Sequence, residues 1–306
     1  MSSPSPIEKA IYTTVCWFAV SSYPLTVFEI YKWLWSPGQG FSLSDIFLAL
    51  SESQWLQNRL SYQDGFYTIK QSQQIGQLIK MRRIRYLDAC RKFEKLKKII
   101  KYFAWLSGVQ AVAAANTLSW WHTNKQSDID LFIIVKPGTI WLSRLFLVLP
   151  FALLRQRPNT GGIGIDPFCF SFFVSKDKLC LETLSIATPD PYLTYWIQSL
   201  VPVLDRQCIF DKLVTKNSWV KNYLPNSFLQ PLHPCLGQVQ TLGIVLAPRL
   251  FEGLARRFQM RRFPDRLKKI ANQDSRVIVN DQMLKFHVDD ERLNYKAKFE
   301  ELIDTM

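Results

Sequence analysis

The chain has 306 residues, 48% of them hydrophobic, and a formal net charge of +13. The hydrophobic fraction excludes an intrinsically disordered protein, and the length allows two or three domains. The positive charge favours nucleic acid, phosphates or anionic lipid as partners without choosing among them. Six scattered cysteines form no C-x-x-C pair and the start is not typical of a signal peptide, which predicts a cytoplasmic protein with reduced thiols.

Residues 6–70 are predicted to form one small unit that begins with three helices. Apolar residues at helical spacing predict these helices over 7–20, 27–35 and 43–51. Capping-box pairs precede the second and third helices, namely Thr26 with Glu29 and Ser42 with Asp45.

The same unit ends in a predicted hairpin over 60–69, because Gln63-Asp64-Gly65 lies between aromatic strand residues. Three helices and a hairpin indicate a winged-helix-like domain. Its third helix should enter the major groove in a DNA-binding protein, but this helix contains no Lys or Arg. We therefore expect a scaffold or protein-docking role here rather than DNA reading.

Residues 71–106 are predicted to form one long linker helix whose apolar positions recur at helical spacing. A solvated basic face is the simpler interpretation, and a surface for RNA, DNA or nucleotide phosphates is the functional one. The basic residues are Lys80, Arg82, Arg83, Arg85, Arg91, Lys92, Lys95, Lys97, Lys98 and Lys101.

Two acids, Asp128 and Asp130, lie at the start of an apolar run that predicts a strand over 129–135. Strand side chains alternate, so both carboxylates point to one face while Ile129 and Leu131 point into a core. Neighbouring acids at a buried strand repel each other and lose hydration, and a divalent cation can neutralise them. Mg²⁺ takes one or two carboxylates and keeps water and substrate phosphates as its other ligands. The alternative is a solvated strand end.

A strand over 109–115, the turn Asn116-Thr117 and a helical turn precede this pair. The arrangement resembles the nucleotidyltransferase superfamily with its polymerase-beta-like fold. The whole chain is similar to uncharacterised bacterial proteins with a central nucleotidyltransferase domain. That wider similarity is carried by Tyr23-Pro24-Leu25-Thr26, by the strand at 168–174 and by Met283-Leu284-Lys285-Phe286-His287-Val288.

This resemblance implies an α/β nucleotidyltransferase-like domain at 107–187. It implies that Asn116 and Thr117 stand where the family has Gly and Ser and, with Ser127, bind the nucleotide phosphates. It also implies that Asp128 and Asp130 hold Mg²⁺, as a two-metal or a single-metal site. Thr117 keeps the hydroxyl, and Asn tolerates a positive φ better than most residues.

A third carboxylate of the family is not evident on strand 168–174, where Cys169 or Ser171 takes its place. We expect that strand to form a hairpin with 179–186, which makes Glu182 the candidate third catalytic acid. Asp166 lies just before the first strand. Either Glu182 serves, or one metal binds, or catalysis has been lost.

Two further segments of the central domain are ambiguous. The apolar stretch 140–154 contains Arg144 and is shorter than the ~20 residues of a membrane span, so a buried helix is expected and an interfacial membrane helix is the alternative. The Gly-rich segment 159–164 lacks the P-loop pattern and is interpreted as a connector.

Residues 188–306 are expected to form a helical region, with helices around 192–204, 238–258 and 290–303. A second basic cluster here has either a solvated or a nucleic-acid-binding role. It consists of Arg256, Arg257, Arg261, Arg262, Arg266, Lys268 and Lys269.

The resemblance implies a Mg²⁺-dependent nucleotidyltransferase that moves a nucleoside monophosphate from a nucleoside triphosphate to an unidentified hydroxyl acceptor, such as RNA, DNA, a protein or a small molecule. The alternative is a catalytically degenerate fold that binds nucleotides or nucleic acid. A third hypothesis is association with a membrane surface through the basic faces and segment 140–154.

Overall fold

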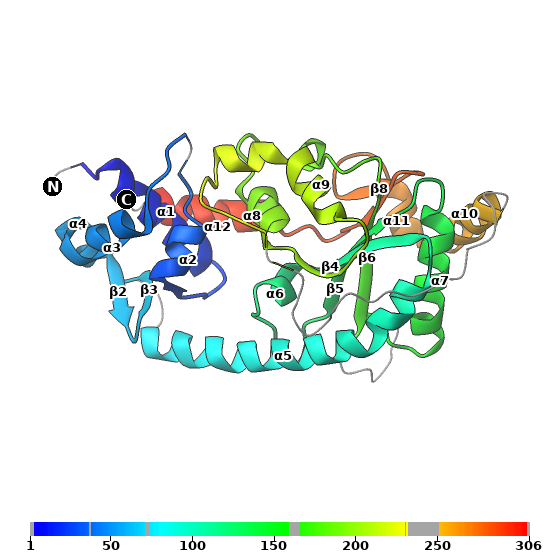
Figure 1. Cartoon of the computed structure of the whole chain (residues 1–306), viewed down its shortest axis with the longest axis horizontal. Coiled ribbons are helices and arrows are strands. Elements are labelled where there is room, and N and C mark those ends of the chain that lie inside the picture. The colour runs from blue at the N-terminus through cyan, green and yellow to red at the C-terminus, as the bar shows by residue number, and fades with distance from the viewer. Residues whose placement is uncertain are drawn as a thin grey trace.

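The protein is mixed α/β, with one six-stranded mixed sheet and one three-stranded antiparallel sheet (Figure 1). This confirms the expected α/β class. The computed structural model describes residues 3–36, 38–70, 74–158, 166–229, 231 and 251–304. The Gly-rich segment 159–164 lies outside the described residues, as does most of the predicted helix at 238–258.

The N-terminal unit packs short helices against the small sheet, whose strand order is β1-β3-β2. Both predicted capping boxes form: Thr26 Oγ1 accepts the backbone N–H of Glu29 at 3.3 Å, and Ser42 Oγ accepts that of Asp45 at 3.1 Å. The hairpin turn at 64–65 forms as predicted, whereas α4 was not predicted. The elements are α1 (Pro6–Ala19), β1 (Leu25–Thr26), α2 (Val27–Lys32), α3 (Leu43–Glu52), α4 (Gln54–Arg59), β2 (Leu60–Gln63) and β3 (Phe66–Ile69).

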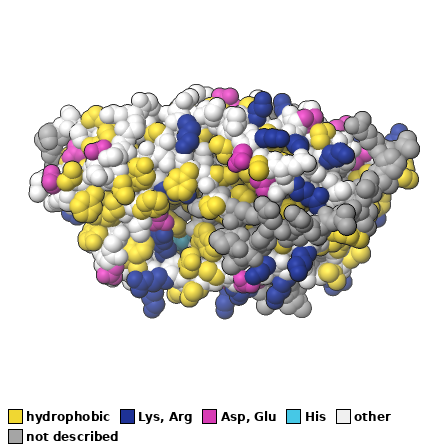
Figure 2. Space-filling view, in the orientation of Figure 1, with side chains coloured by type: hydrophobic (Ala, Val, Ile, Leu, Met, Phe, Trp, Pro, Cys, Tyr) yellow, Lys and Arg dark blue, Asp and Glu magenta, His cyan; other side chains and the backbone are white. Residues whose placement is uncertain are grey.

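The long helix α5 (Ile75–Trp105) runs along the long axis of the molecule, from the N-terminal unit to the central sheet (Figure 1). Its N-terminal half is tied to α2 because Arg82 donates to both carboxylate oxygens of Glu29, at 2.9 and 2.5 Å. Exposed basic side chains follow the lower edge of the molecule, where α5 runs (Figure 2). They include Lys80, Arg83, Lys97, Lys98 and Lys101.

The six-stranded sheet has the order β7-β4-β5-β6-β9-β8, with β5 and β6 parallel and the other pairs antiparallel. Three of its strands come from residues 188–306, so the expectation of a helical C-terminal region is wrong in this respect. The strands are β4 (Val109–Ala114), β5 (Ile129–Val135), β6 (Phe168–Ser175), β7 (Val201–Asp205), β8 (Val277–Val279) and β9 (Met283–Phe286).

Both faces of this sheet are buried, which explains why β5 is a continuous apolar run. One face carries Phe132 and Phe172, which contact Trp196 of α8 (Pro191–Ser199). The other face, which includes Ile133 and Phe173, belongs to the apolar cluster formed with α5 and α7. The remaining helical elements are α6 (Asn116–Ser119), α7 (Ile140–Leu153), η1 (Glu182–Leu184), α9 (Ile209–Lys216), η2 (Ser218–Asn222), α10 (Glu252–Arg262), α11 (Asp265–Ile270) and α12 (Arg292–Asp304).

The predicted hairpin after β6 is wrong. Segment 179–186 forms no strand and instead contains η1. The side chain of Asn217 holds this segment, accepting from the N–H of Leu181 at 2.8 Å and donating to the carbonyl of Leu179 at 2.7 Å. The free edge of β6 pairs with β9 instead, because the apolar β9 residues extend the buried faces of the sheet.

The predicted helix at 192–204 also divides, since α8 ends at Ser199 and the chain continues as β7. The C-terminal helix α12 returns to the N-terminal unit and packs on α1 (Figure 1). Tyr295 donates to the carbonyl of Trp17 at 2.9 Å, and the ring of Trp17 stacks on that of Tyr195. The first and last helices therefore share one aromatic core.

No helix within the described residues combines the length and apolar character needed to cross a bilayer. The segment 140–154 forms α7, and the buried helix expected here is confirmed only in part. Its inward side includes Trp141 and Leu147, whereas Phe146, Leu149, Leu153 and Leu154 are exposed. The five cysteines in the described part of the chain are free thiols.

Candidate functional site

A cavity of about 650 Å³ lies where β4, β5 and β6 meet α8 and the segment after β9. Its lining brings together the predicted Asp128, Asp130 and Asn116. The expectation that both acids share one face next to the 116–117 turn therefore agrees with the geometry. Other lining residues are Cys169, Ser171, Tyr192, Trp196, Arg266, Lys285, Phe286, His287, Asp289, Asp290 and Arg292.

Strand pairing places the acids beside the turn. The N–H of Ala115 donates to the carbonyl of Asp130 at 3.0 Å, so Asn116 follows directly beside that acid. Burial, and then the charge of Asp130, raises the pKa of Asp128 from 3.8 to about 6. Burial also raises the pKa of Asp130, although hydrogen bonds from Cys169 and Asn116 oppose the shift. Within the described residues neither acid forms an ion pair, although the charge of Lys92 opposes the rise in the pKa of both.

Asn116, just after β4, has a positive φ of 52°, a conformation that Asn tolerates better than most residues. Its Oδ1 accepts from Trp196 Nε1 at 2.9 Å, which fixes the amide in the cavity wall. Thr117 is exposed and does not line the cavity. Since α6 has only four residues, its macrodipole can contribute little to phosphate binding.

Ser127 lies outside the cavity lining and closes a turn. Its Oγ accepts the N–H of Asn124 at 3.0 Å, and its own N–H donates to Asn124 Oδ1 at 3.1 Å. The implied contact of Ser127 with nucleotide phosphate therefore has no geometric support. Its position in the sequence is explained by the turn that leads the chain into Asp128.

The buried Lys92 of α5 stabilises this turn by hydrogen bonds to its backbone. Its Nζ donates to the carbonyls of Asn124 at 2.5 Å and Ser127 at 2.7 Å, and lies 3.2 Å from Asp88. Sequence reasoning grouped Lys92 with the basic surface of the helix. Its spacing could have distinguished Lys92 from the exposed basic residues, because it lies three residues after Ala89 on the apolar side of α5.

Asp166 belongs to the same support and not to the acid pair. Its buried carboxylate contacts Arg91 and lies 3.7 Å from Lys92, while Lys95 donates to its carbonyl at 2.8 Å. Asp166 directly precedes Pro167 and β6, and the turn from Asn124 to Ser127, which Lys92 binds, leads in the same way into β5. The basic residues of α5 therefore fix the entry points of the two parallel strands that carry the site.

A thiol lies beside Asp130 on the neighbouring strand. In the β5–β6 register Cys169 stands opposite Asp130, and Ser171 follows it along the cavity wall. Burial and the charge of Asp130 raise the pKa of Cys169 well above its usual range, so it remains a neutral thiol. Glu182 is exposed at the start of η1 and does not line the cavity. Its expected place on a strand beside the acids is wrong.

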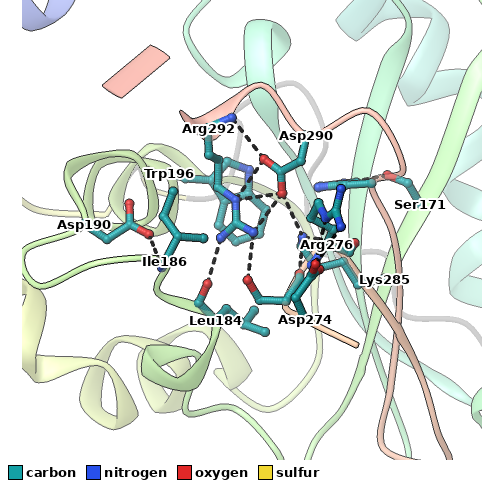
Figure 3. Close-up of polar contacts among 12 residues, drawn as sticks. Ser171, Leu184, Ile186, Asp190, Trp196, Asp274, Arg276, Lys285, Asp290 and Arg292 are labelled. Atoms are coloured by element: carbon teal, nitrogen blue, oxygen red, sulfur yellow. Dashed lines mark hydrogen bonds and ion pairs between the residues drawn. The ribbon is translucent and has the colours of Figure 1, made fainter. Parts of the chain in front are cut away.

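The far wall of the cavity comes from the C-terminal part of the chain, which sequence reasoning did not assign to the site. Figure 3 shows Arg292 bridging Asp290, at 2.7 Å, and the carbonyl of Leu184, also at 2.7 Å. Burial, and then the charge of Arg292, lowers the pKa of Lys285 to about 8. The sequence pointed to this wall only through residues 283–288, one of the segments that carry the similarity to the bacterial nucleotidyltransferase-domain proteins.

His287 continues this wall and faces β6. Its Nε2 lies 3.2 Å from the Oγ of Ser171, a residue that is labelled in Figure 3. Burial and the neighbouring charge of Lys285 lower the pKa of His287 to about 3. The imidazole is therefore neutral at pH 7 and can accept or donate one hydrogen bond without adding charge.

The cavity offers a metal ion two neighbouring carboxylates, Asp128 and Asp130. Among residues 3–304 that are described, no group of three or more His, Cys, Asp and Glu side chains is placed to hold a metal. Two hard oxygen donors fit Mg²⁺, which completes its shell with water and substrate phosphates, but do not fit zinc. Comparison with protein-family models found no match, and neither the curated proteins nor the solved structures contain a significant match to this chain.

Proposed function

We propose that the chain is a Mg²⁺-dependent nucleotidyltransferase that moves a nucleoside monophosphate from a nucleoside triphosphate to a hydroxyl acceptor. The observation that carries this proposal is the pair Asp128 and Asp130, half-buried and without an ion-pair partner among the described residues, in a large cavity beside the positive-φ Asn116. A structural role does not explain two like charges held together there, because their repulsion and desolvation cost stability.

In this proposal Asp128 and Asp130 hold the metal ion, which would neutralise charge on the triphosphate and at the α-phosphorus. Lys285 and Arg292 line the cavity but lie 3.9 and 2.7 Å from Asp290, which neutralises them, so the metal ion would be the main positive charge for the pyrophosphate. Tyr192 offers an aromatic face for the base. The acceptor oxygen bonds to the α-phosphorus, the bond from that phosphorus to pyrophosphate breaks, and the hydroxyl proton passes to solvent water.

The fold supports the finer architecture expected from the sequence. In the proposed architecture residues 6–70, with the order helix, short strand, three helices and hairpin, form a winged-helix-like domain. Its α3 exposes Leu43, Phe47 and Leu48, and the helix has no Lys or Arg. This composition argues against phosphate contacts through α3. The sheet around β4, β5 and β6 is the proposed nucleotidyltransferase-like core.

The test is label transfer from nucleoside triphosphates carrying a labelled α-phosphate, incubated with Mg²⁺ and a cell extract as acceptor source. We expect transfer by the wild type and its loss, by at least about a hundredfold, in the Asp128→Asn Asp130→Asn variant. Asp177→Asn, an exposed acid in the turn after β6 and outside the cavity lining, is the matched control and should retain activity. Transfer that persists in the double variant refutes the assignment.

A second candidate is a degenerate fold that binds nucleotide without transferring it. The neutral Cys169 opposite Asp130, where the resemblance requires an acid, favours this candidate. Calorimetric titration with a nonhydrolysable nucleoside triphosphate separates the two. Binding that depends on Mg²⁺ supports the enzyme, and binding that is indifferent to Mg²⁺ and to the double variant supports the degenerate fold.

A further inference from the structure

A second cavity, of about 470 Å³, adjoins the site between α7, β6 and α10–α11. The two cavities share Cys169 and Ser171 on β6 and Pro264 and Leu267 on the opposite side. The wall of the second cavity therefore reaches Cys169, the register partner of Asp130.

The second cavity contains a buried guanidinium, Arg144, in the otherwise apolar helix α7. The side chain is only 9% exposed, and its Nε has no hydrogen-bond partner in the described structure. One amino group donates to Gln259 Oε1 at 2.5 Å. The guanidinium carbon lies 4.8 Å from the ring centroid of Phe286 and 5.4 Å from that of Phe263.

No carboxylate neutralises this guanidinium. The described residues include every Asp and Glu of the chain, and among them none forms an ion pair with Arg144. Arg157 and Arg262 line the same cavity and add positive charge. Burial, and then the charge of Arg157, lowers the pKa of Arg144 to about 9, so the group stays charged at pH 7.

An unpaired buried charge destabilises a folded protein, and a second like charge beside it adds to that cost. Gln259 is neutral and engages only one end of the guanidinium. An anion with several acceptor oxygens would neutralise the cavity and satisfy the free Nε, since guanidinium binds phosphate through two parallel hydrogen bonds. The apolar lining, which includes Val148, Phe170 and Phe258, would cover an organic body attached to that anion.

We propose that the Arg144 cavity binds the phosphate-monoester group of a small organic molecule and that this molecule is the acceptor. The burial of Arg144 favours a terminal phosphate on a small molecule over the phosphodiester backbone of a nucleic acid. A backbone phosphate is flanked by nucleotides on both sides, which prevent it from entering a buried pocket. The acceptor assignment rests on the proposed function, whereas the binding site does not.

Calorimetry with phenyl phosphate tests the site, with benzyl alcohol as the uncharged analogue. We expect phenyl phosphate to bind the wild type and benzyl alcohol not to bind detectably. Arg144→Met should weaken phenyl phosphate binding about tenfold or more, the usual loss for a hydrogen bond to a charged group. Arg257→Met, an exposed arginine on α10, is the matched control and should bind as the wild type does. Absence of binding to the wild type, or unchanged binding by Arg144→Met, overturns the proposal.

Folding is controlled independently. Arg144→Met removes an unpaired buried charge, so its thermal midpoint should equal or exceed that of the wild type. Should this variant fail to fold, Arg144→Lys keeps the charge but loses the planar fork, and should still weaken phenyl phosphate binding several-fold. Undiminished binding by a folded Arg144→Lys variant counts against the site as well.

Label transfer tests the acceptor role. Labelled nucleoside triphosphate is added to a small-molecule extract, either untreated or treated with a phosphatase that is then removed. We expect the labelled product to disappear after phosphatase treatment and in Arg144→Met. A product that survives both overturns the acceptor assignment. The two proposals fail separately: Asp128→Asn Asp130→Asn should lose transfer but keep phenyl phosphate binding, and a chain that transfers nothing can still bind phenyl phosphate through Arg144.

Discussion

Replacement of Lys92 by Met is predicted to destabilise the protein because Lys92 is the internal support of the turn before Asp128. Its Nζ satisfies the carbonyls of Asn124 and Ser127 at 2.5 and 2.7 Å, and the side chain is 0% exposed. Met keeps the length and the packing of the side chain, so the change removes the charged donor and little else.

The magnitude follows from the partners that remain. The nearby carboxylates of Asp88 and Asp166 keep Arg91, which contacts both, so they are not left unpaired. The two carbonyls lose their charged donor, at about 1–3 kcal/mol for each unsatisfied buried group. We expect the free energy of unfolding to fall by about 3 kcal/mol, near the lower end of values for a broken buried pair.

Urea denaturation followed by tryptophan fluorescence measures this loss. Lys98→Met, on the exposed side of the same helix, is the matched control and should stay within about 0.5 kcal/mol of the wild type. A Lys92→Met variant that unfolds at the same urea concentration as Lys98→Met would refute the structural role of this amine.

The remaining predictions concern the cavity. The pKa of Asp128 is raised to about 6 in the folded protein, so the folded state binds this proton more tightly than the unfolded state does. The protonated Asp128 therefore stabilises the fold below about pH 4, and this contribution is lost as the pH rises through 6. Asp128→Asn should therefore gain stability over the wild type on moving from pH 4 to pH 7 without metal, and equal shifts in both melting curves would contradict the raised pKa. Asn116→Gly and Asn116→Val both lose the hydrogen bond from Trp196 Nε1, and the Val variant should be less stable than the Gly variant by about 1–3 kcal/mol, because a β-branched residue is strained at positive φ. Equal melting temperatures for these two variants would contradict that strain.

The sequence by itself determined the elements that depend on short-range chemistry. Capping pairs such as Thr26 with Glu29 specify helix starts, and the apolar run with its two leading acids specifies β5 and the shared face of Asp128 and Asp130. These features involve residues a few positions apart, so spacing alone is sufficient to predict them.

Only the tertiary structure decided which residues surround those acids. The pairing of β9 with β6, more than a hundred positions apart, placed His287 and Lys285 in the cavity and left Glu182 outside it. The same packing turned Lys92 inward and buried Arg144, although neighbouring basic residues on α5 remain in solvent. Side chains of one chemical type are separated in this way because burial and long-range pairing depend on the whole fold, and no local pattern contains that information.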